Sequence, residues 1–221
     1  MLQLPEAEDL RTRLQKLGIS DDSRIVVYYG QDWVSPSTRV LFTLQFAGLG
    51  ERTHLLDGGM QAWVRSGGAL SHAPAVTQPG KLASLRTQVL TVDAGYVRSH
   101  LDEPGFVVVD ARATVYYDGI ETGGAHGQTD RTGHIKGALS IPFTEVTDER
   151  LQLRSQSELR SLFERAGVKP GDTIIGYCHI GQQATAMLFA ARLLGHPVRL
   201  YDGSFQDWSR SDENPFEAAK P

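Results

Sequence analysis

The sequence lacks the features that mark membrane-spanning and exported proteins. No apolar run approaches the roughly 20 residues that a bilayer-spanning helix needs, and the opening MLQLPEAEDL has neither the basic nor the apolar region of an export signal. We therefore expect no membrane association. The chain as it stands is expected in the cytoplasm, or in the periplasm if a longer protein supplies a signal before it, so its compartment stays open.

An excess of one charge is also missing. The chain has 22 basic and 26 acidic residues, which give a formal net charge of -4. This balance provides no attraction of the whole molecule to nucleic acid, so nucleic-acid partners are not expected. Cysteine is scarce as well, because Cys178 is the only one among 221 residues. A single thiol cannot form an internal disulfide, and it is therefore either buried packing or a reactive group.

What the sequence does contain is an internal repeat. Residues 14–30 align without a gap on residues 163–179, which pairs Tyr29 with Cys178. Further along, LLDGGMQAW (55–63) aligns on LYDGSFQDW (200–208). Each copy reads helix, turn, short β-branched strand, loop, helix, short strand and Asp-Gly, a pattern typical of βαβ units. The sequence therefore predicts an α/β protein of two modules, each with a parallel sheet flanked by helices.

The two modules are predicted to differ in completeness. Residues 85–221 form a full module, with a leading half that includes a helix-like stretch over 91–100 and a strand over 106–112. Residues 1–70 have no such leading half, and residues 71–84, rich in Pro, Ala and Gly, read as a linker. A sheet that lacks an inner strand exposes backbone groups and apolar surface. We therefore expect the first module to be truncated at its N-terminus and poorly folded alone unless a partner covers it, which makes homodimerisation through it a prediction.

Cys178 is predicted to lie where a strand turns into a helix. DTIIGYC has the apolar run of a buried strand, and ATAMLFAARLLG has the apolar spacing of a helix. The loop CHIGQQ (178–183) would then curl over the helix N-terminus, where free N–H groups favour an anion, and Gly181 permits the positive φ that such a turn requires. A thiolate held there is a competent nucleophile. If the cysteine is considered alone, a buried and inert thiol is an equally good interpretation. The loop and the helix that follow it favour a reactive thiol.

Four segments in order resemble the rhodanese-type sulfurtransferases. They are VVVDAR (107–112), GHIKGALSIPF (133–143), the cysteine loop and LYDGSFQDW (200–208). The tandem arrangement is similar to the two-domain thiosulfate and 3-mercaptopyruvate sulfurtransferases, and with it the resemblance covers nearly the whole chain. In that family the N-terminal module is usually inactive, which agrees with the tyrosine that matches Cys178 in the first module.

The resemblance implies a ping-pong reaction with Cys178 as the catalytic residue. The thiolate would take the outer sulfur of a small-molecule donor, hold it as a persulfide and pass it to a thiophilic acceptor such as cyanide or a thiol. Main-chain amides around the sulfur would stabilise both anions. No metal and no organic cofactor is implied.

The identity of the donor depends on the surroundings of the cysteine, and there the sequence departs from the family. Thiosulfate-specific relatives commonly have cations after the cysteine, whereas this chain has His179 and Ile180, and an arginine frequent in the family is replaced by Tyr116. Arg112 remains as a fixed cation, although a structural ion pair with Asp110 or a loop carbonyl is an equal interpretation. Thiosulfate is expected slightly ahead of 3-mercaptopyruvate. The predicted substrate-binding residues are Arg112, Tyr116, His179, Ile180, Gly181, Gln182 and Gln183.

Other residues permit different interpretations. His126, Asp130 and His134 suggest a metal site, but the intervening glycines deny them a helix face, and no metal is expected; His134 is instead expected to order a loop. Trp63 and Trp208 are predicted to lie in the core, one per module.

Two other classes of function remain to be compared with sulfur transfer. A phosphatase of this scaffold would need an arginine at the end of the cysteine loop, and none follows Cys178 before Arg192. A persulfide carrier or regulatory binding module is the alternative to an enzyme, because such a protein would be loaded once without cycling.

Overall fold

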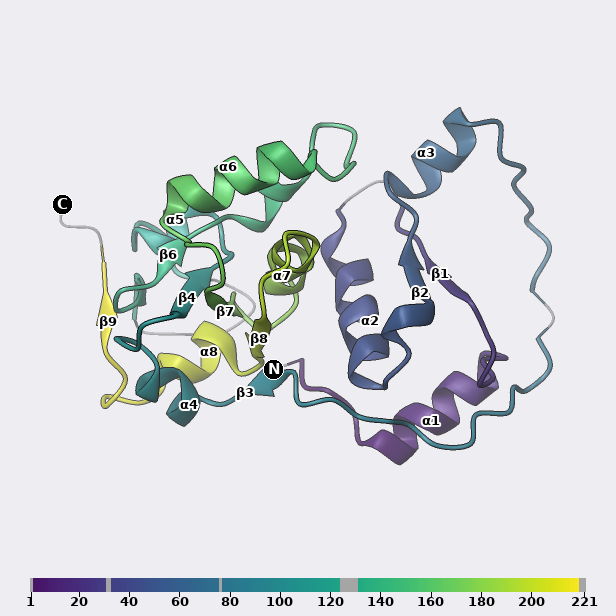
Figure 1. Cartoon of the computed structure of the whole chain (residues 1–221), viewed down its shortest axis with the longest axis horizontal. Helices are drawn as coiled ribbons and strands as arrows, with labels where there is room; N and C mark the ends of the chain where they lie inside the picture. Colours follow the sequence, from purple (N-terminus) through teal and green to yellow (C-terminus); the bar gives the residue numbers. More distant parts are fainter. Residues whose placement is uncertain (1, 31–32, 76, 124–130, 219–221) are drawn as a thin grey trace. The chain divides into compact units, whose positions relative to one another are not determined.

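The computed structural model describes residues 2–30, 33–75, 77–123 and 131–218. The chain divides into two compact units (Figure 1). We call Leu4–Val89 the N-unit, and Leu90–Pro221 together with Met1–Gln3 the C-unit. Within the described residues, no helix has the length and apolar character needed to cross a bilayer.

The C-unit is built on a five-stranded sheet in which every paired neighbour is parallel. The strand order is β3-β8-β7-β4-β6, so the central strand β7 lies between β8 and β4. Two of the three inner strands, β4 and β7, consist largely of buried β-branched residues, as expected for a sheet that is covered on both faces. The strands are β3 (Thr91–Val92), β4 (Phe106–Asp110), β6 (Leu139–Ser140), β7 (Thr173–Tyr177) and β8 (Val198–Tyr201).

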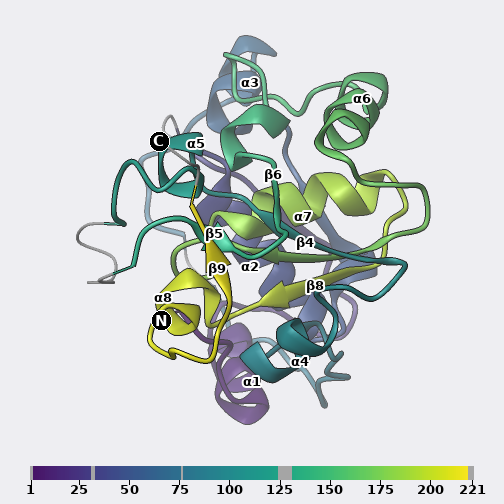
Figure 2. The same ribbon diagram turned by 90° about the vertical axis from the view of Figure 1, so that its left-hand side faces the viewer.

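Helices cover both faces of this sheet (Figures 1 and 2). Helices α6 (Gln156–Ala166) and α7 (Ala184–Leu193) lie on one face, and α4 (Ala94–Ser99) and α8 (Ser204–Trp208) on the other. Local sequence sets their ends: Ser155 and Glu158 form a capping box at the start of α6, and Gly167 ends it with φ +105°. The short elements α5 (Thr114–Tyr117), η3 (Phe143–Val146) and the antiparallel pair β5 (His134–Ile135) and β9 (Phe216–Glu217) complete the unit.

One predicted boundary in the C-unit is wrong. The helix expected over 91–100 begins only at Ala94, because Thr91 and Val92 form strand β3 beside β8. Both residues are β-branched and so favour a strand. Asp93 then starts the helix by accepting a hydrogen bond from Tyr96 N–H at 2.8 Å.

The N-unit contains a two-stranded parallel sheet of β1 and β2. Its elements α1, β1, α2, β2 and α3 follow the same order as α6, β7, α7, β8 and α8 of the C-unit. Among the described residues, the two units thus share one order of helices and strands. The bounds are α1 (Ala7–Lys16), β1 (Ile25–Val27), α2 (Ser35–Phe46), η1 (Gly50–Arg52), β2 (Thr53–Leu55) and α3 (Gly59–Arg65).

Each unit has a hydrophobic core of its own. In the C-unit, a cluster on the α4 and α8 face of the sheet includes Val97, Val108, Ile175, Tyr177 and Trp208. In the N-unit, leucines of α1 and α2 pack with Ala47, Leu49 and Leu82, the last of which comes from the segment predicted as a linker.

The core prediction for Trp63 is wrong. Trp208 is wholly buried in the C-unit, but its counterpart Trp63 is exposed to nearly half its extent. Trp208 packs in a cluster with Val97 of α4 and Val108 of β4, and the described residues of the N-unit form no elements that match α4 and β4.

The segment after residue 76 packs on the N-unit. Gly80 N–H donates to Gln15 O at 2.7 Å, Gln88 N–H donates to Phe46 O at 2.9 Å, and the side chain of Leu82 is buried. The predicted linker of 71–84 thus includes residues that are fixed to the N-unit by hydrogen bonds and apolar contact. A linker of this kind behaves as part of the unit it covers.

Candidate active site

Cys178 directly follows strand β7, and the loop 178–183 leads into α7. Its side chain is fully buried. Gly181 N–H donates to Cys178 Sγ at 3.3 Å, and Gly181 has the positive φ, +89°, that turns its amide toward the sulfur. A hydrogen bond from a main-chain amide favours the anionic form of a thiol. The sequence predicts several amides around the sulfur, and within the described residues the structure shows a hydrogen bond from Gly181.

The start of α8 fixes the backbone of the cysteine loop. Phe205 N–H donates to Cys178 O at 3.0 Å, and Gln206 N–H donates to His179 O at 3.1 Å. Cys178 N–H in turn donates to the hydroxyl of Ser204 at 3.3 Å. The sequence did not predict these three contacts, because the spacing between the cysteine loop and α8 does not indicate which of their backbone groups will form hydrogen bonds.

Arg112 forms a buried ion pair beside the loop. Its Nε and Nη2 donate to the carboxylate of Asp110 at 2.6–3.1 Å, and Nη2 also donates to Gly133 O at 2.7 Å. Both side chains of the pair are almost inaccessible. The guanidinium carbon lies 4.1 Å from the ring centre of Phe205, the residue that binds the carbonyl of Cys178. Both structural partners that the sequence suggests for Arg112, Asp110 and a loop carbonyl, are therefore present.

Arg112 keeps its positive charge in this buried position. Burial works against the charged guanidinium, but the attraction and hydrogen bonds of Asp110, with smaller contributions from Tyr177 and from an anionic Cys178, raise the pKa of Arg112 above its ordinary value. Arg112 is therefore a permanent cation beside the cysteine loop.

Tyr116 and His179 meet in space although they are distant in sequence. Their ring centres are 4.6 Å apart in an edge-to-face contact. Gly123 packs closely against the same imidazole. A Cβ atom at this position would lie only 2.6 Å from Nδ1 of His179, so a larger residue would not fit without a shift. Two of the three positions at which the sequence departs from the charged pattern that the resemblance implies thus form one aromatic contact beside the cysteine loop.

The two glutamines at the end of the loop have different surroundings. Gln182 O accepts both the N–H and the hydroxyl of Thr185, and so shapes the first turn of α7. Gln183 has a buried amide oxygen that finds no hydrogen-bond partner within the described residues. A buried polar atom without a partner is costly, and this oxygen retains the capacity to accept a hydrogen bond. Ile180 has its carbonyl bonded to Leu2 N–H at 3.4 Å.

The structure orders the loop around His134 as expected. His134 Nδ1 lies 2.7 Å from Tyr117 O, and its ring stacks on that of Tyr117 with centres 3.7 Å apart. His126 and Asp130 lie outside the described residues. Across the ranges that are described, no group of three or more potential ligands could hold a metal ion.

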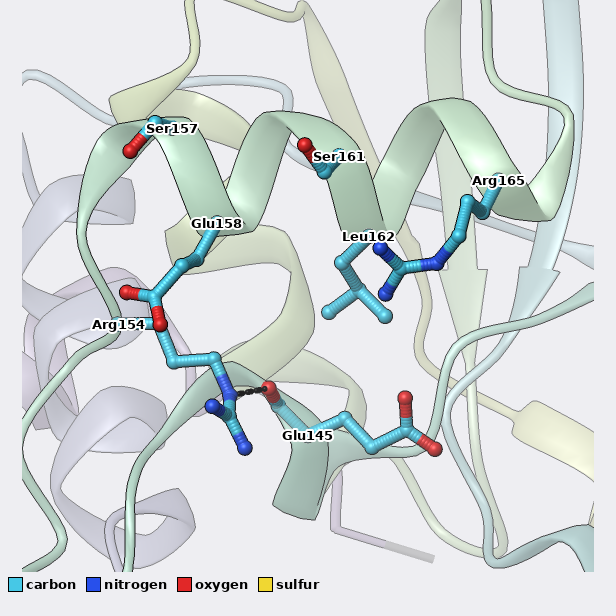
Figure 3. Close-up of a pocket in the computed structure, with 7 residues that line it drawn as sticks. All are labelled: Glu145, Arg154, Ser157, Glu158, Ser161, Leu162 and Arg165. Carbon is cyan, nitrogen blue, oxygen red and sulfur yellow. Dashed lines mark hydrogen bonds between the residues drawn. The ribbon is translucent and has the colours of Figure 1, made fainter.

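A hollow elsewhere in the C-unit contains none of the predicted site residues (Figure 3). It has a volume of about 500 Å³ and lies between η3 and α6. Figure 3 shows that its charges have mixed sign, and that Arg154 Nε donates to Glu145 O, at 2.8 Å. The lining residues are Glu145, Arg154, Ser157, Glu158, Ser161, Leu162 and Arg165.

Comparison with known proteins identifies the fold and its family. Residues 93–211 match the rhodanese-like domain, which includes the cysteine loop and the start of α8. The chain belongs to the rhodanese-like family. It is 30% identical to a probable 3-mercaptopyruvate sulfurtransferase of Pseudomonas aeruginosa, over 96% of this chain and 74% of that protein. It is 31% identical to the thiosulfate sulfurtransferase of Rattus norvegicus, over 95% of this chain and 70% of that one.

Solved structures of EanB share this fold. Wild-type EanB superposes with a TM-score of 0.84 at 25% identity, over 97% of this chain. The chain spans 55% of that protein's length. An EanB variant that matches equally well was solved in complex with ergothioneine covalently linked to a cysteine persulfide.

Proposed function

We propose that this protein is a sulfurtransferase that moves a sulfane sulfur through a persulfide on Cys178. The observation that supports this most strongly is the buried Sγ that accepts a main-chain hydrogen bond from Gly181, at the end of a central parallel strand of a rhodanese-like fold. The relatives named above are sulfurtransferases of the two kinds that the sequence suggests.

The proposed reaction has two half-reactions. In the first, the thiolate of Cys178 attacks the outer sulfur of the donor; for thiosulfate, the S–S bond breaks and sulfite leaves with the bonding pair. The resulting persulfide anion keeps the amide of Gly181 and the charge of Arg112 as stabilising neighbours. In the second, the acceptor attacks the outer sulfur, and Cys178 leaves as the thiolate that began the cycle. No net oxidation or reduction of the enzyme occurs.

We propose that the contact between Tyr116 and His179 forms part of the donor site. It carries less fixed charge than the arginines that stand at these positions in many relatives, so thiosulfate, with its dianionic charge, gains less from it. Gln183 can donate from its amide Nε2 to a sulfonate or a carboxylate oxygen. Thiosulfate and 3-mercaptopyruvate are therefore both candidate donors, with Arg112, Ile180, Gly181 and Gln182 shaping the site.

Steady-state turnover tests the proposal. Purified protein is assayed with thiosulfate or 3-mercaptopyruvate as donor and cyanide as acceptor, and thiocyanate is measured. We expect many turnovers per protein, and none for Cys178→Ser. A single stoichiometric release with wild-type protein would instead assign the persulfide-carrier alternative, and activity retained by Cys178→Ser would exclude the mechanism. Homodimerisation through the N-unit stays a prediction for size-exclusion chromatography.

A further inference from the structure

The first residue of α8, Ser204, has an unusual backbone. Its φ is +55°, and its side chain is fully buried. Residues with a side chain rarely adopt this conformation, because the Cβ atom crowds the backbone. Among the described residues other than glycine, only Leu151 shares a positive φ. A strained residue of this kind persists when the surrounding structure holds it in place.

The N-unit has the same turn with the residue that suits it. Gly59 is the counterpart of Ser204, and its φ is also +55°. The backbone contact is repeated too, since Met60 N–H donates to Tyr29 O at 2.9 Å, as Phe205 N–H does to Cys178 O. The turn therefore requires a positive φ in both units. Glycine is used where the strand ends in a tyrosine, and serine where it ends in the nucleophile.

The hydroxyl of Ser204 explains why a strained serine is useful beside the thiol. It accepts the N–H of Cys178 at 3.3 Å and donates to Tyr201 O at 2.9 Å. On the other side of the same residue, Phe205 N–H donates to the carbonyl of Cys178. The start of α8 therefore holds the peptide groups both before and after the Cα of Cys178. Holding both groups fixes the direction in which the Cα–Cβ bond leaves the backbone. That direction carries Sγ to the amide of Gly181.

We propose that Ser204 is a positioning residue for the nucleophile. It does not touch the reacting sulfur. Its hydroxyl accepts a hydrogen bond from the N–H of Cys178 and so keeps Sγ in position to accept the hydrogen bond of the Gly181 amide. The proposal rests on Cys178 being the reactive group of the proposed function, and it adds a residue outside the cysteine loop to the machinery of that site.

The decisive variant is Ser204→Gly, which removes the hydroxyl and also relieves the backbone strain. We expect its thermal midpoint to stay close to wild type, because the relief of strain offsets the lost hydrogen bonds. The alkylation of Cys178 by iodoacetamide should nevertheless slow about fivefold at neutral pH, the effect of losing one net hydrogen bond. The pH at which alkylation reaches half its maximal rate should rise. Ser204→Ala should show the same reactivity with lower stability, because the strain remains.

Two controls complete the design. Ser209→Ala, at the other end of α8, removes a buried hydroxyl that has no partner in the described structure, and should leave the alkylation profile unchanged. Alkylation needs no sulfur donor, so a wild-type protein that is alkylated normally yet transfers no sulfur would contradict the proposed function without deciding the role of Ser204. An unchanged alkylation rate and pH profile in Ser204→Gly would overturn the positioning role. Loss of folding in that variant would overturn it too, by making the hydroxyl a requirement of the fold.

With sulfur donor present, the same variants are tested by kinetics. Single-turnover persulfide formation in Ser204→Gly should slow by a similar factor while the KM for the donor stays near wild type, because donor contacts are made by other residues. A raised KM with an unchanged rate constant would contradict the proposal and assign Ser204 to donor binding.

Discussion

Trp63 and Trp208 occupy equivalent positions in the two units, yet Trp63 is 45% exposed and Trp208 is 0% exposed. The same contrast separates Val26, which is exposed, from its counterpart Ile175, which is buried. In the C-unit, Trp208 and Ile175 belong to one cluster with Val97 from α4 and Val108 from β4. Val26 and Trp63 are thus exposed, whereas their aligned counterparts in the C-unit pack with residues of α4 and β4.

Acrylamide quenching of tryptophan fluorescence tests this contrast. A protein that keeps only Trp63 should be quenched more steeply, and should emit at longer wavelength, than one that keeps only Trp208. The two proteins are made by replacing the other tryptophans with phenylalanine, Trp33 included. Equal quenching of the two would mean that the face around Trp63 is covered in solution.

The exposed face also predicts how fragments behave. Residues 1–70 alone should show no cooperative thermal transition by circular dichroism, since they expose apolar surface and lack Leu82, which packs in the core of the N-unit. Residues 85–221, with the five-stranded sheet intact, should melt cooperatively and serve as the control. A cooperative melt of the shorter fragment would refute the expectation that it needs a covering partner.

The sequence predicted the parts of the site that depend on local pattern. The apolar run of β7, the apolar spacing of α7 and the glycine at position 181 all follow from residue types at short range. The contacts between distant segments could not be predicted from the sequence. The hydroxyl of Ser204 on the cysteine amide and the contact of Tyr116 with His179 depend on how loops from different strands meet. The exposure of Trp63 was missed because position in the repeat was taken to imply equal burial.

The ion pair of Arg112 and Asp110 predicts a large effect on stability. Replacing Asp110 by Asn leaves a buried guanidinium without its counter-charge, and should lower the free energy of unfolding by about 3–5 kcal/mol. Urea unfolding followed by circular dichroism measures it. Asp212→Asn is the matched control, because Asp212 pairs with Arg131 at the surface and should cost less than about 1 kcal/mol. Equal losses for the two variants would contradict a stabilising role for the buried pair.

Donor preference should respond to charge at Tyr116. Tyr116→Arg places a cation against His179, and should lower the KM for thiosulfate about tenfold, the effect of one charge-assisted hydrogen bond. The KM for 3-mercaptopyruvate, which carries one negative charge on its carboxylate, should fall less. Val115→Arg adds the same charge one residue away and controls for net charge. Equal effects of both variants on thiosulfate would show that Tyr116 has no special place in the donor site.

Intact-protein mass spectrometry tests the central claim most directly. The protein is incubated with thiosulfate or 3-mercaptopyruvate, without acceptor, and weighed before and after treatment with cyanide. The account predicts a gain of one sulfur atom that cyanide removes, and no gain after prior alkylation of the thiol or in Cys178→Ser. An unchanged mass with both donors, or a gain that survives in Cys178→Ser, would contradict it.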